Sequence, residues 1–221
     1  MNWQIRFVAA AGVTAGCSLA AVLVGTYAKG PVASAAISVT GPEPYTPSYT
    51  KEGDLIPPVQ YREWIFLSSG LDMSYNAKAS SNSGGAMSMF DNVFVNPEAY
   101  RAFMATGTWP DKTVMVLETR GATNKGSINK SGHFQNGELM GAEIHIKDEA
   151  RFPGKWAFFD VESELKATLI PSGAPCYSCH AEHAAVDTTF VQFYPTLLPI
   201  AQKKGTLSAN YLKEVAAEKS K

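Results

Sequence analysis

Residues Cys176 to His180 read Cys-Tyr-Ser-Cys-His, so that two thiols are separated by two residues and a histidine follows directly. Attachment of a c-type haem requires this arrangement. Each thiol adds to one of two vinyl groups on the same porphyrin edge, and the adjacent histidine turns under the ring to ligate the iron. The motif therefore predicts one covalently bound haem c per chain, attached at Cys176 and Cys179, with His180 as the proximal iron ligand.

Two other chemistries also use closely spaced cysteines. A redox-active pair normally opens a helix after an early strand of a thioredoxin-like fold, whereas this pair comes near the end of the chain. A structural zinc site needs a second pair of ligands, and His183 is the one further ligand nearby. Both alternatives remain open, but both are weaker than haem attachment in a chain whose only other cysteine is Cys17.

The first 35 residues have the features of a targeting segment. An apolar run over residues 7–28 follows Arg6, and Ala33 to Ala35 supply the small-x-small pattern of a signal-peptidase site. We expect residues 1–35 to be a signal peptide and the protein to be exported to the periplasm. A run of about 22 residues is also long enough to span a bilayer, so an uncleaved membrane anchor is the alternative. Lipidation at Cys17 is disfavoured because apolar residues continue behind it.

The remainder has the composition of one folded domain. The chain is 45% hydrophobic and 18% charged, which favours a packed core over disorder. Prolines spread over residues 36–60 indicate an extended approach, and we place a linker at 36–52 and a single domain at 53–221. Without the targeting segment, 17 Lys and Arg face 20 Asp and Glu, a formal charge of −3. Nothing in this balance attracts nucleic acid.

Several stretches alternate between apolar and polar residues, the pattern of half-buried strands. The sequence predicts an α+β fold with a mostly antiparallel sheet. A helix is expected between the second and third strands, with Asn96 as its cap, Pro97 in its first turn and Gly107 at its end. Aromatic and apolar residues from Phe190 to Leu198 recur at helical spacing and could wall a haem or simply pack in the core. Strands are expected at 62–68, 90–95, 113–119, 142–147 and 156–162, and loops at 75–88 and 120–138.

Four blocks of the sequence, in this order, resemble the cytochrome P460 family, which includes the cytochromes c'-beta. The resemblance covers nearly all of residues 53–201. It implies a mostly antiparallel β domain, often a homodimer, that holds one c-type haem with a proximal histidine and a distal side open to small ligands. The blocks are YREW at Tyr61–Trp64, VFVNPEAY at Val93–Tyr100, WAFF at Trp156–Phe159 and the run that begins CYSCHAEHAA at Cys176.

One position departs from the P460 branch. Members of that branch oxidise hydroxylamine and nitric oxide and carry a lysine that is covalently joined to the porphyrin, in a Val-Lys-Glu pattern. This chain reads Val116, Leu117, Glu118, and leucine cannot form that bond. Lys112 could substitute only with a register shift of five residues, and such a shift would turn its side chain to the opposite face of the strand. The departure moves the expectation toward the c'-beta branch, whose members bind nitric oxide without a cross-link.

The resemblance also assigns further residues to the haem site. Glu143 matches a distal carboxylate that shuttles protons, and alternation places it on one strand face with His145, whose position could be in the pocket or at an exposed rim. Met115 should share a strand face with Leu117, so that two apolar groups stand where the lysine would have been. A methionine could instead be the sixth iron ligand.

These residues are compatible with three functions of a haem protein. The first is an exported haem protein that binds or oxidoreductively processes nitric oxide or hydroxylamine at an open iron site. Its expected redox partner is a periplasmic electron carrier. The second is a periplasmic electron-transfer cytochrome with both axial positions filled by protein. The third is a hydroxylamine oxidase of the P460 type. A thiol oxidoreductase ranks last.

Overall fold

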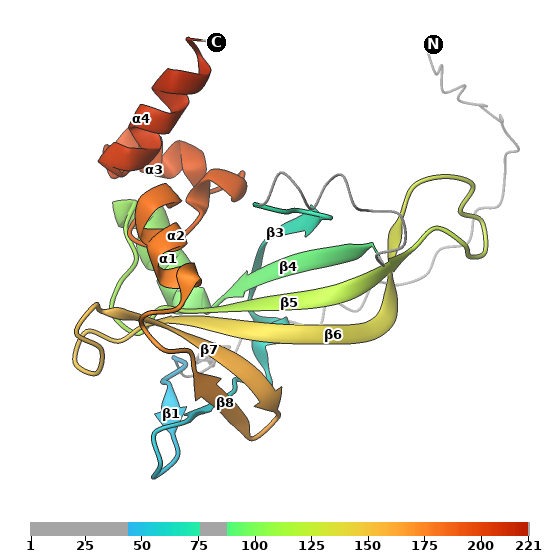
Figure 1. Ribbon diagram of the computed structural model, residues 1–221, viewed down its shortest axis with the longest axis horizontal. Coiled ribbons are helices and arrows are strands. Elements are labelled where there is room, and N and C mark those ends of the chain that lie inside the picture. The colour runs from blue at the N-terminus through green and yellow to red at the C-terminus, as the bar shows by residue number, and fades with distance from the viewer. Residues whose placement is uncertain (1–43, 76–87, 221) are drawn as a thin grey trace, which may run out of the picture. The chain divides into compact units, whose positions relative to one another are not determined.

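Within residues 44–75 and 88–220, which the computed structural model describes, eight strands form one antiparallel sheet (Figure 1). The sheet order is β1-β2-β8-β7-β6-β5-β4-β3. The described residues belong to one unit that spans Pro42–Lys221. The expected signal peptide and most of the expected loop at 75–88 lie outside the described residues. The strands are β1 Ser48–Tyr49, β2 Leu55–Ile56, β3 Ile65–Leu71, β4 Met89–Val95, β5 Val114–Thr123, β6 Phe134–Lys147, β7 Trp156–Ser163 and β8 Lys166–Leu169.

The antiparallel α+β fold expected from the sequence is confirmed, and β3 to β7 correspond to the five predicted strands. The predicted loop at 120–138 is partly wrong. Strand β5 continues to Thr123 and β6 begins at Phe134, and these two residues pair across the ladder. Cross-strand pairing thus extends into a segment whose glycines and asparagines favour turns. Strand β1 lies inside the expected linker, where Tyr49 pairs with Leu55 of β2.

Alternation along the strands gives the sheet two buried faces. On one face Val114 and Val116 of β5 pack with Ile144 and Ile146 of β6 and with Phe159 of β7. On the other face Met115 packs with Trp156 and with helical residues such as Phe103. Because successive side chains of a strand point to opposite faces, neighbouring residues of β5 serve different cores.

Helix α1 (Pro97–Thr106) matches the predicted helix. Gly107 ends it with φ 79°, and its backbone N–H donates to the Phe103 carbonyl at 2.7 Å. Asn96 occupies the N-cap position of α1 as predicted, but its side chain makes no capping hydrogen bond. Its Oδ1 accepts instead from the backbone N–H of Val114 at 2.8 Å, which ties the start of α1 to β5.

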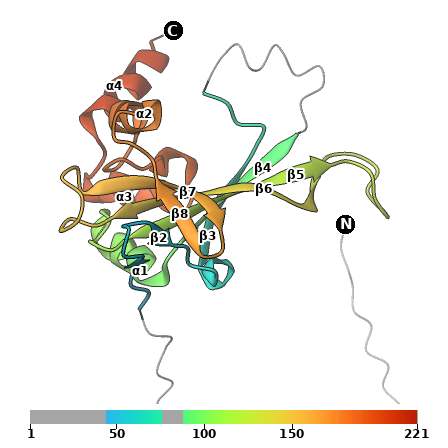
Figure 2. The same cartoon turned by 60° about the horizontal axis from the view of Figure 1, so that its bottom comes forward.

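The remaining helices gather at the same end of the sheet as α1, which is the left end in both ribbon views (Figure 1 and Figure 2). They are α2 (Pro175–His183), α3 (Leu198–Lys204) and α4 (Ala209–Glu218). The aromatic run expected on one helix side is divided between a 3-10 turn at Val191–Phe193 and α3. No helix in the described part of the chain is long and apolar enough to cross a membrane.

Candidate functional site

Helix α2 carries the whole attachment motif. Proline opens the helix at Pro175, where its missing N–H costs no hydrogen bond. Cys176, Cys179 and His180 follow at spacings of three and four, which places them on neighbouring positions of one helix face. All three line a single cavity of about 300 Å³. The structure therefore brings the three residues of the motif together at the wall of one pocket.

A hydrogen bond at Nδ1, one of the two ring nitrogens, orients the His180 side chain. Its Nδ1 lies 2.7 Å from the backbone oxygen of Thr188, which makes Nδ1 the protonated nitrogen. No hydrogen bond within the described residues engages Nε2. Burial lowers the pKa of His180, and the bond to Thr188 opposes that effect in part. The ring is thus a neutral imidazole with Nε2 available, the state in which histidine ligates iron.

The loop that supplies the Thr188 carbonyl is fixed at both ends of its turn. Asp187 has φ 52°, a left-handed conformation that non-glycine residues adopt rarely. The Thr189 hydroxyl accepts from the indole N–H of Trp109 at 2.8 Å and donates to the Val186 carbonyl at 2.8 Å. Both Trp109 and Thr189 are buried, so this anchor holds the loop against the core.

Tyr177, inside the motif, fixes α2 to the sheet. Its hydroxyl donates to the carbonyl of Ile170 at 3.0 Å and accepts from the backbone N–H of Phe158 at 3.2 Å. The Phe158 ring lies edge-on to Tyr177 at 4.8 Å between centroids. These contacts position the helix that carries the cysteines relative to β7.

The structure supports neither alternative chemistry for the cysteines. Burial raises the pKa of the Cys179 thiol, and the negative charge of Glu182 adds to this, whereas a redox nucleophile needs a lowered pKa. For zinc, no three His, Cys, Asp or Glu side chains in the described ranges lie close enough together to hold a metal ion. The side chain of His183 pairs with Glu214 of α4 instead.

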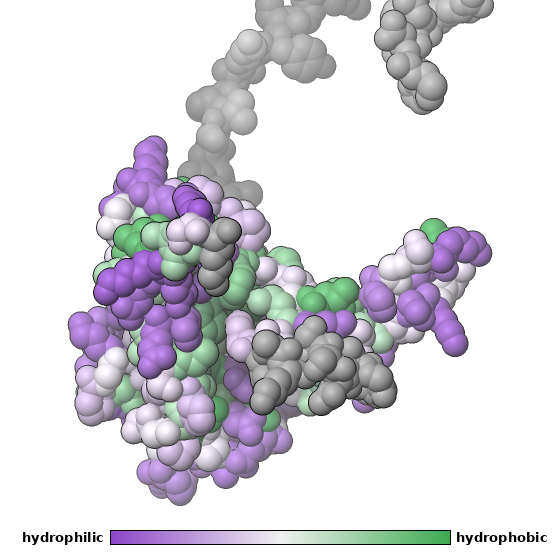
Figure 3. Space-filling model, turned by 45° about the horizontal axis from the view of Figure 1, so that its top comes forward, coloured by the Kyte–Doolittle hydropathy of each residue, from purple (hydrophilic) through white to green (hydrophobic). Residues whose placement is uncertain are grey.

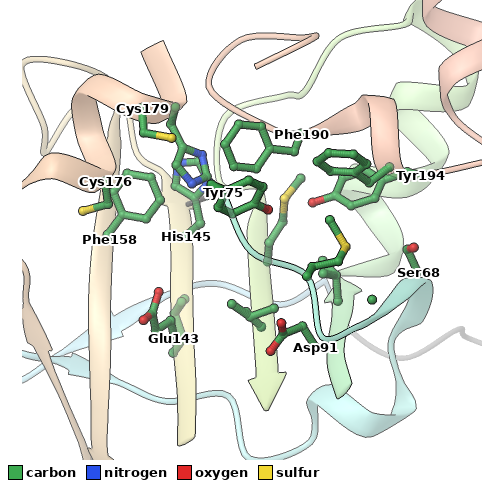
Figure 4. Close-up of a pocket in the computed structure, with 18 residues that line it drawn as sticks. Ser68, Tyr75, Asp91, Glu143, His145, Phe158, Cys176, Cys179, Phe190 and Tyr194 are labelled. Atoms are coloured by element: carbon green, nitrogen blue, oxygen red, sulfur yellow. The ribbon is translucent and has the colours of Figure 1, made fainter. Parts of the chain in front are cut away.

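Two carboxylates stand in the cavity wall on strands beside the motif. Glu143 of β6 and Asp91 of β4 both line the cavity, and Figure 4 shows them on the strands at a distance from Cys179. Partial burial raises the pKa of Glu143, and the charges of Asp160 and Asp91 act in the same direction. Although part of the Glu143 side chain is desolvated, much of the residue remains exposed, so solvent reaches this end of the cavity. Sequence reasoning did not select Asp91, although its alternation with Val93 in β4 could have indicated it.

Leu117 and Met115 also line the cavity, as neighbouring same-face residues of β5. Leu117 pairs in register with Glu143, and Val93 lies on its other side in β4. Lys112 precedes the strand and forms an ion pair with Asp148, and it is not part of the cavity wall. The cavity has no lysine or arginine in its wall among the residues that the structure describes.

His145, which alternation left between pocket and rim, is buried with 9% of its surface exposed. It lines the cavity beside His180, and the two ring centroids are 5.2 Å apart. Burial, with a smaller contribution from His180, lowers the pKa of His145 well below its ordinary value. The ring is therefore neutral, and an exposed rim position is ruled out.

The residues present fit a c-type haem. Both motif thiols are free and line the same cavity as His180. The wall is largely apolar, with Phe158, Phe190 and Tyr194 among its residues. On the face shown in Figure 3, green patches of apolar surface lie beside hydrophilic side chains. A planar hydrophobic macrocycle needs such a wall.

Comparison with known proteins gives one family match. The family model described as cytochrome P460 matches residues 58–191, more than half of the chain. No curated protein matches the chain. The matched range includes three of the four sequence blocks in full and the attachment motif of the fourth. This chain belongs to the cytochrome P460 family.

Proposed function

We propose that this haem c protein attaches its haem at Cys176 and Cys179, uses His180 as the proximal ligand, and binds nitric oxide or a related small nitrogen oxide at an open iron position. The observation that carries the proposal is the composition of the cavity wall beside the motif: Leu117 and Glu143, register partners on β5 and β6, both face it. Haem, when bound, supplies the iron that coordinates the ligand and exchanges electrons.

The residues around the cavity have distinct tasks in this proposal. His180 would hold the iron through its unprotonated Nε2, because Nδ1 is bonded to the Thr188 carbonyl. Leu117 and Val93 give the strand wall an apolar surface that suits a small uncharged ligand. Glu143 holds or accepts a proton, because its raised pKa brings its titration closer to neutral pH than that of an ordinary glutamate.

The cavity composition also favours ligand binding over hydroxylamine oxidation of the P460 type. That chemistry depends on a lysine joined to the porphyrin, and the described cavity wall contains no lysine. The position that the family pattern assigns to that lysine is Leu117 in this chain, and Leu117 lines the cavity. The proposal therefore follows the c'-beta branch.

An electron-transfer cytochrome is the second candidate, and a specific observation favours it. Met115 and Met73 both line the cavity, so a thioether could complete the axial ligation of the iron. Met115 is buried at 3% exposure in the core beside the cavity, whereas Met73 is 39% exposed. Of the two, Met73 has more freedom to approach an iron atom.

Titration of the ferrous holoprotein with nitric oxide separates the two candidates. Wild type, Met73→Leu and Met115→Leu are matured with the c-type machinery and compared without oxygen. If the iron position is open, all three proteins bind nitric oxide with similar association rates. If wild type binds slowly and one leucine variant binds at least about tenfold faster, that methionine occupies the position and the electron carrier is the better description.

The cellular setting belongs to the same proposal and rests on the sequence. The apolar N-terminal run and its small-x-small site support export to the periplasm, with a membrane anchor if the segment stays uncleaved. A periplasmic electron carrier would supply or remove electrons, and the family resemblance supports a homodimer. The net negative charge supports no role with nucleic acid.

A further inference from the structure

His145 is packed among aromatic side chains next to His180 of the attachment motif. In the sheet register it stands between Met115 of β5 and Phe158 of β7. Its ring stacks on Phe158 with 4.0 Å between centroids and 12° between planes, and Trp156 lies 4.5 Å away. A polar ring held in such a place needs a hydrogen-bond partner, because an unpaired buried polar group is costly.

That partner is the residue that also holds the proximal histidine. The Nε2 of His145 lies 3.2 Å from the hydroxyl oxygen of Thr188. The backbone oxygen of the same Thr188 lies 2.7 Å from Nδ1 of His180. One threonine therefore connects the two histidines, with its side chain bonded to one and its carbonyl to the other.

We propose that His145 is a positioning residue for the proximal ligand: through the Thr188 hydroxyl it holds the Thr188 carbonyl on Nδ1 of His180, and so fixes the orientation and donor strength of the axial histidine. The proposal rests on His180 as the iron ligand. It is independent of which small molecule binds on the opposite side.

The loop geometry shows why such a restraint is needed. Thr188 follows Asp187, whose backbone is left-handed at φ 52°, a conformation that non-glycine residues adopt rarely. Thr189 is anchored to Trp109 on one side of the carbonyl. The His145 contact restrains the residue itself, so that the carbonyl has one well-defined direction.

The hydrogen bond on Nδ1 matters because it changes the ligand. A ring N–H that donates to a fixed acceptor has more electron density on the other nitrogen, which strengthens its bond to a metal. A stronger axial donor stabilises the oxidised iron and lowers the reduction potential. Loosening the Thr188 carbonyl should therefore raise the potential and expose the Nδ1 proton to exchange with solvent.

Three variants of the holoprotein test this link. Thr188→Val removes the hydroxyl and keeps the carbonyl, while Thr188→Ser keeps both. His145→Phe retains an aromatic ring against Phe158 and Trp156 but removes Nε2. Thr113→Val is the control, since it deletes the hydroxyl of a buried threonine that donates to the Pro110 carbonyl at 2.7 Å and lies outside the cavity wall.

The readouts are the reduction potential and, in the ferric protein, the solvent-exchange rate of the ring N–H proton of His180, whose resonance the iron shifts. We expect Thr188→Val and His145→Phe to raise the potential and to speed exchange about fivefold or more, the effect of losing one hydrogen bond of about 1 kcal/mol. Thr188→Ser and Thr113→Val should behave like wild type.

Either of two results would overturn the inference. If Thr188→Val leaves both quantities at their wild-type values, the threonine does not restrain the axial histidine, even if His145→Phe fails to fold. If wild type itself shows no iron-shifted ring N–H proton, and His180→Ala leaves the spectrum unchanged, then His180 is not the ligand. That second result overturns the proposed haem ligation as well, and the two failures are thereby distinguished.

Discussion

Glu118 lies directly after Leu117 on β5 and points to the face of the sheet away from the haem cavity. Its side chain is 3% exposed and forms ion pairs with Arg62 and Arg120, the latter with Nε at 2.6 Å. Its carboxylate also accepts from the Tyr61 hydroxyl and from Nδ2 of Asn92 at 3.3 Å. We predict that Glu118→Gln destabilises the protein in a manner that depends on pH.

The size of the effect follows from the pKa of Glu118. Burial alone would raise this pKa, but the hydrogen bonds from Arg120 and Tyr61 and the charge of Arg62 lower it from 4.5 to about 2. At about 1.4 kcal/mol per pH unit, that difference corresponds to about 3 kcal/mol of stability at pH 7. The side chain of Arg62 is 51% exposed, so solvent screening reduces the expected loss to about 2 kcal/mol.

The pH dependence has a definite sign. Because the folded pKa is depressed, the stabilisation is fully present above pH 4.5 and is lost as the pH falls from 4.5 toward 2. Denaturant unfolding of wild type and Glu118→Gln, at steps from pH 7 down to pH 3, should show a difference that narrows over this range. Glu162→Gln is the control, because its ion pair with Lys166 is on the surface and should leave the unfolding free energy unchanged. A difference that stays constant with pH would refute the reasoning.

Three further predictions concern the haem site. We expect the ferric spectrum to titrate at a pH above the ordinary glutamate pKa, since burial raises the pKa of Glu143, and we expect Glu143→Gln to abolish this titration. The control Glu138→Gln, on the exposed part of β6, should retain the titration. If the titration is unchanged in Glu143→Gln, it belongs to another group. The intact mass should equal the chain plus one unmodified haem, because Leu117 cannot couple to the porphyrin, and a fragment that joins any lysine to porphyrin would contradict this. Acid acetone should leave haem on wild type and remove it from the Cys176→Ala, Cys179→Ala double variant; extraction from wild type would disprove covalent attachment.

Local signals in the sequence were sufficient for the main elements of the fold. Pro97 and Gly107 mark the two ends of α1, because the fixed φ of proline and the positive φ of glycine are properties of the residues themselves. Alternation likewise predicted that Glu143 and His145 share a face, and both line the cavity. The motif on α2 needed no tertiary information at all.

Features that depend on distant partners were not predictable from the sequence. The outer half of β6 is a strand because it pairs with β5, as in Thr123 with Phe134, although its own residues favour a loop. The role of Asn96 depends on the backbone of Val114, which only folding brings near. The same is true of Thr188. Its carbonyl oxygen bonds to His180, 8 positions earlier in the chain, and its hydroxyl bonds to His145, 43 positions earlier.

The central claim is a haem c held by Cys176, Cys179 and His180, with the opposite iron position open and no porphyrin cross-link. The absorption spectrum of the ferrous holoprotein, recorded without added ligand, tests it most directly. We predict the spectrum of a high-spin, five-coordinate c-type haem. A sharp low-spin spectrum would show that a protein side chain fills the second axial position, and a band shifted far to the red would show a modified porphyrin. Either of these results would contradict the account.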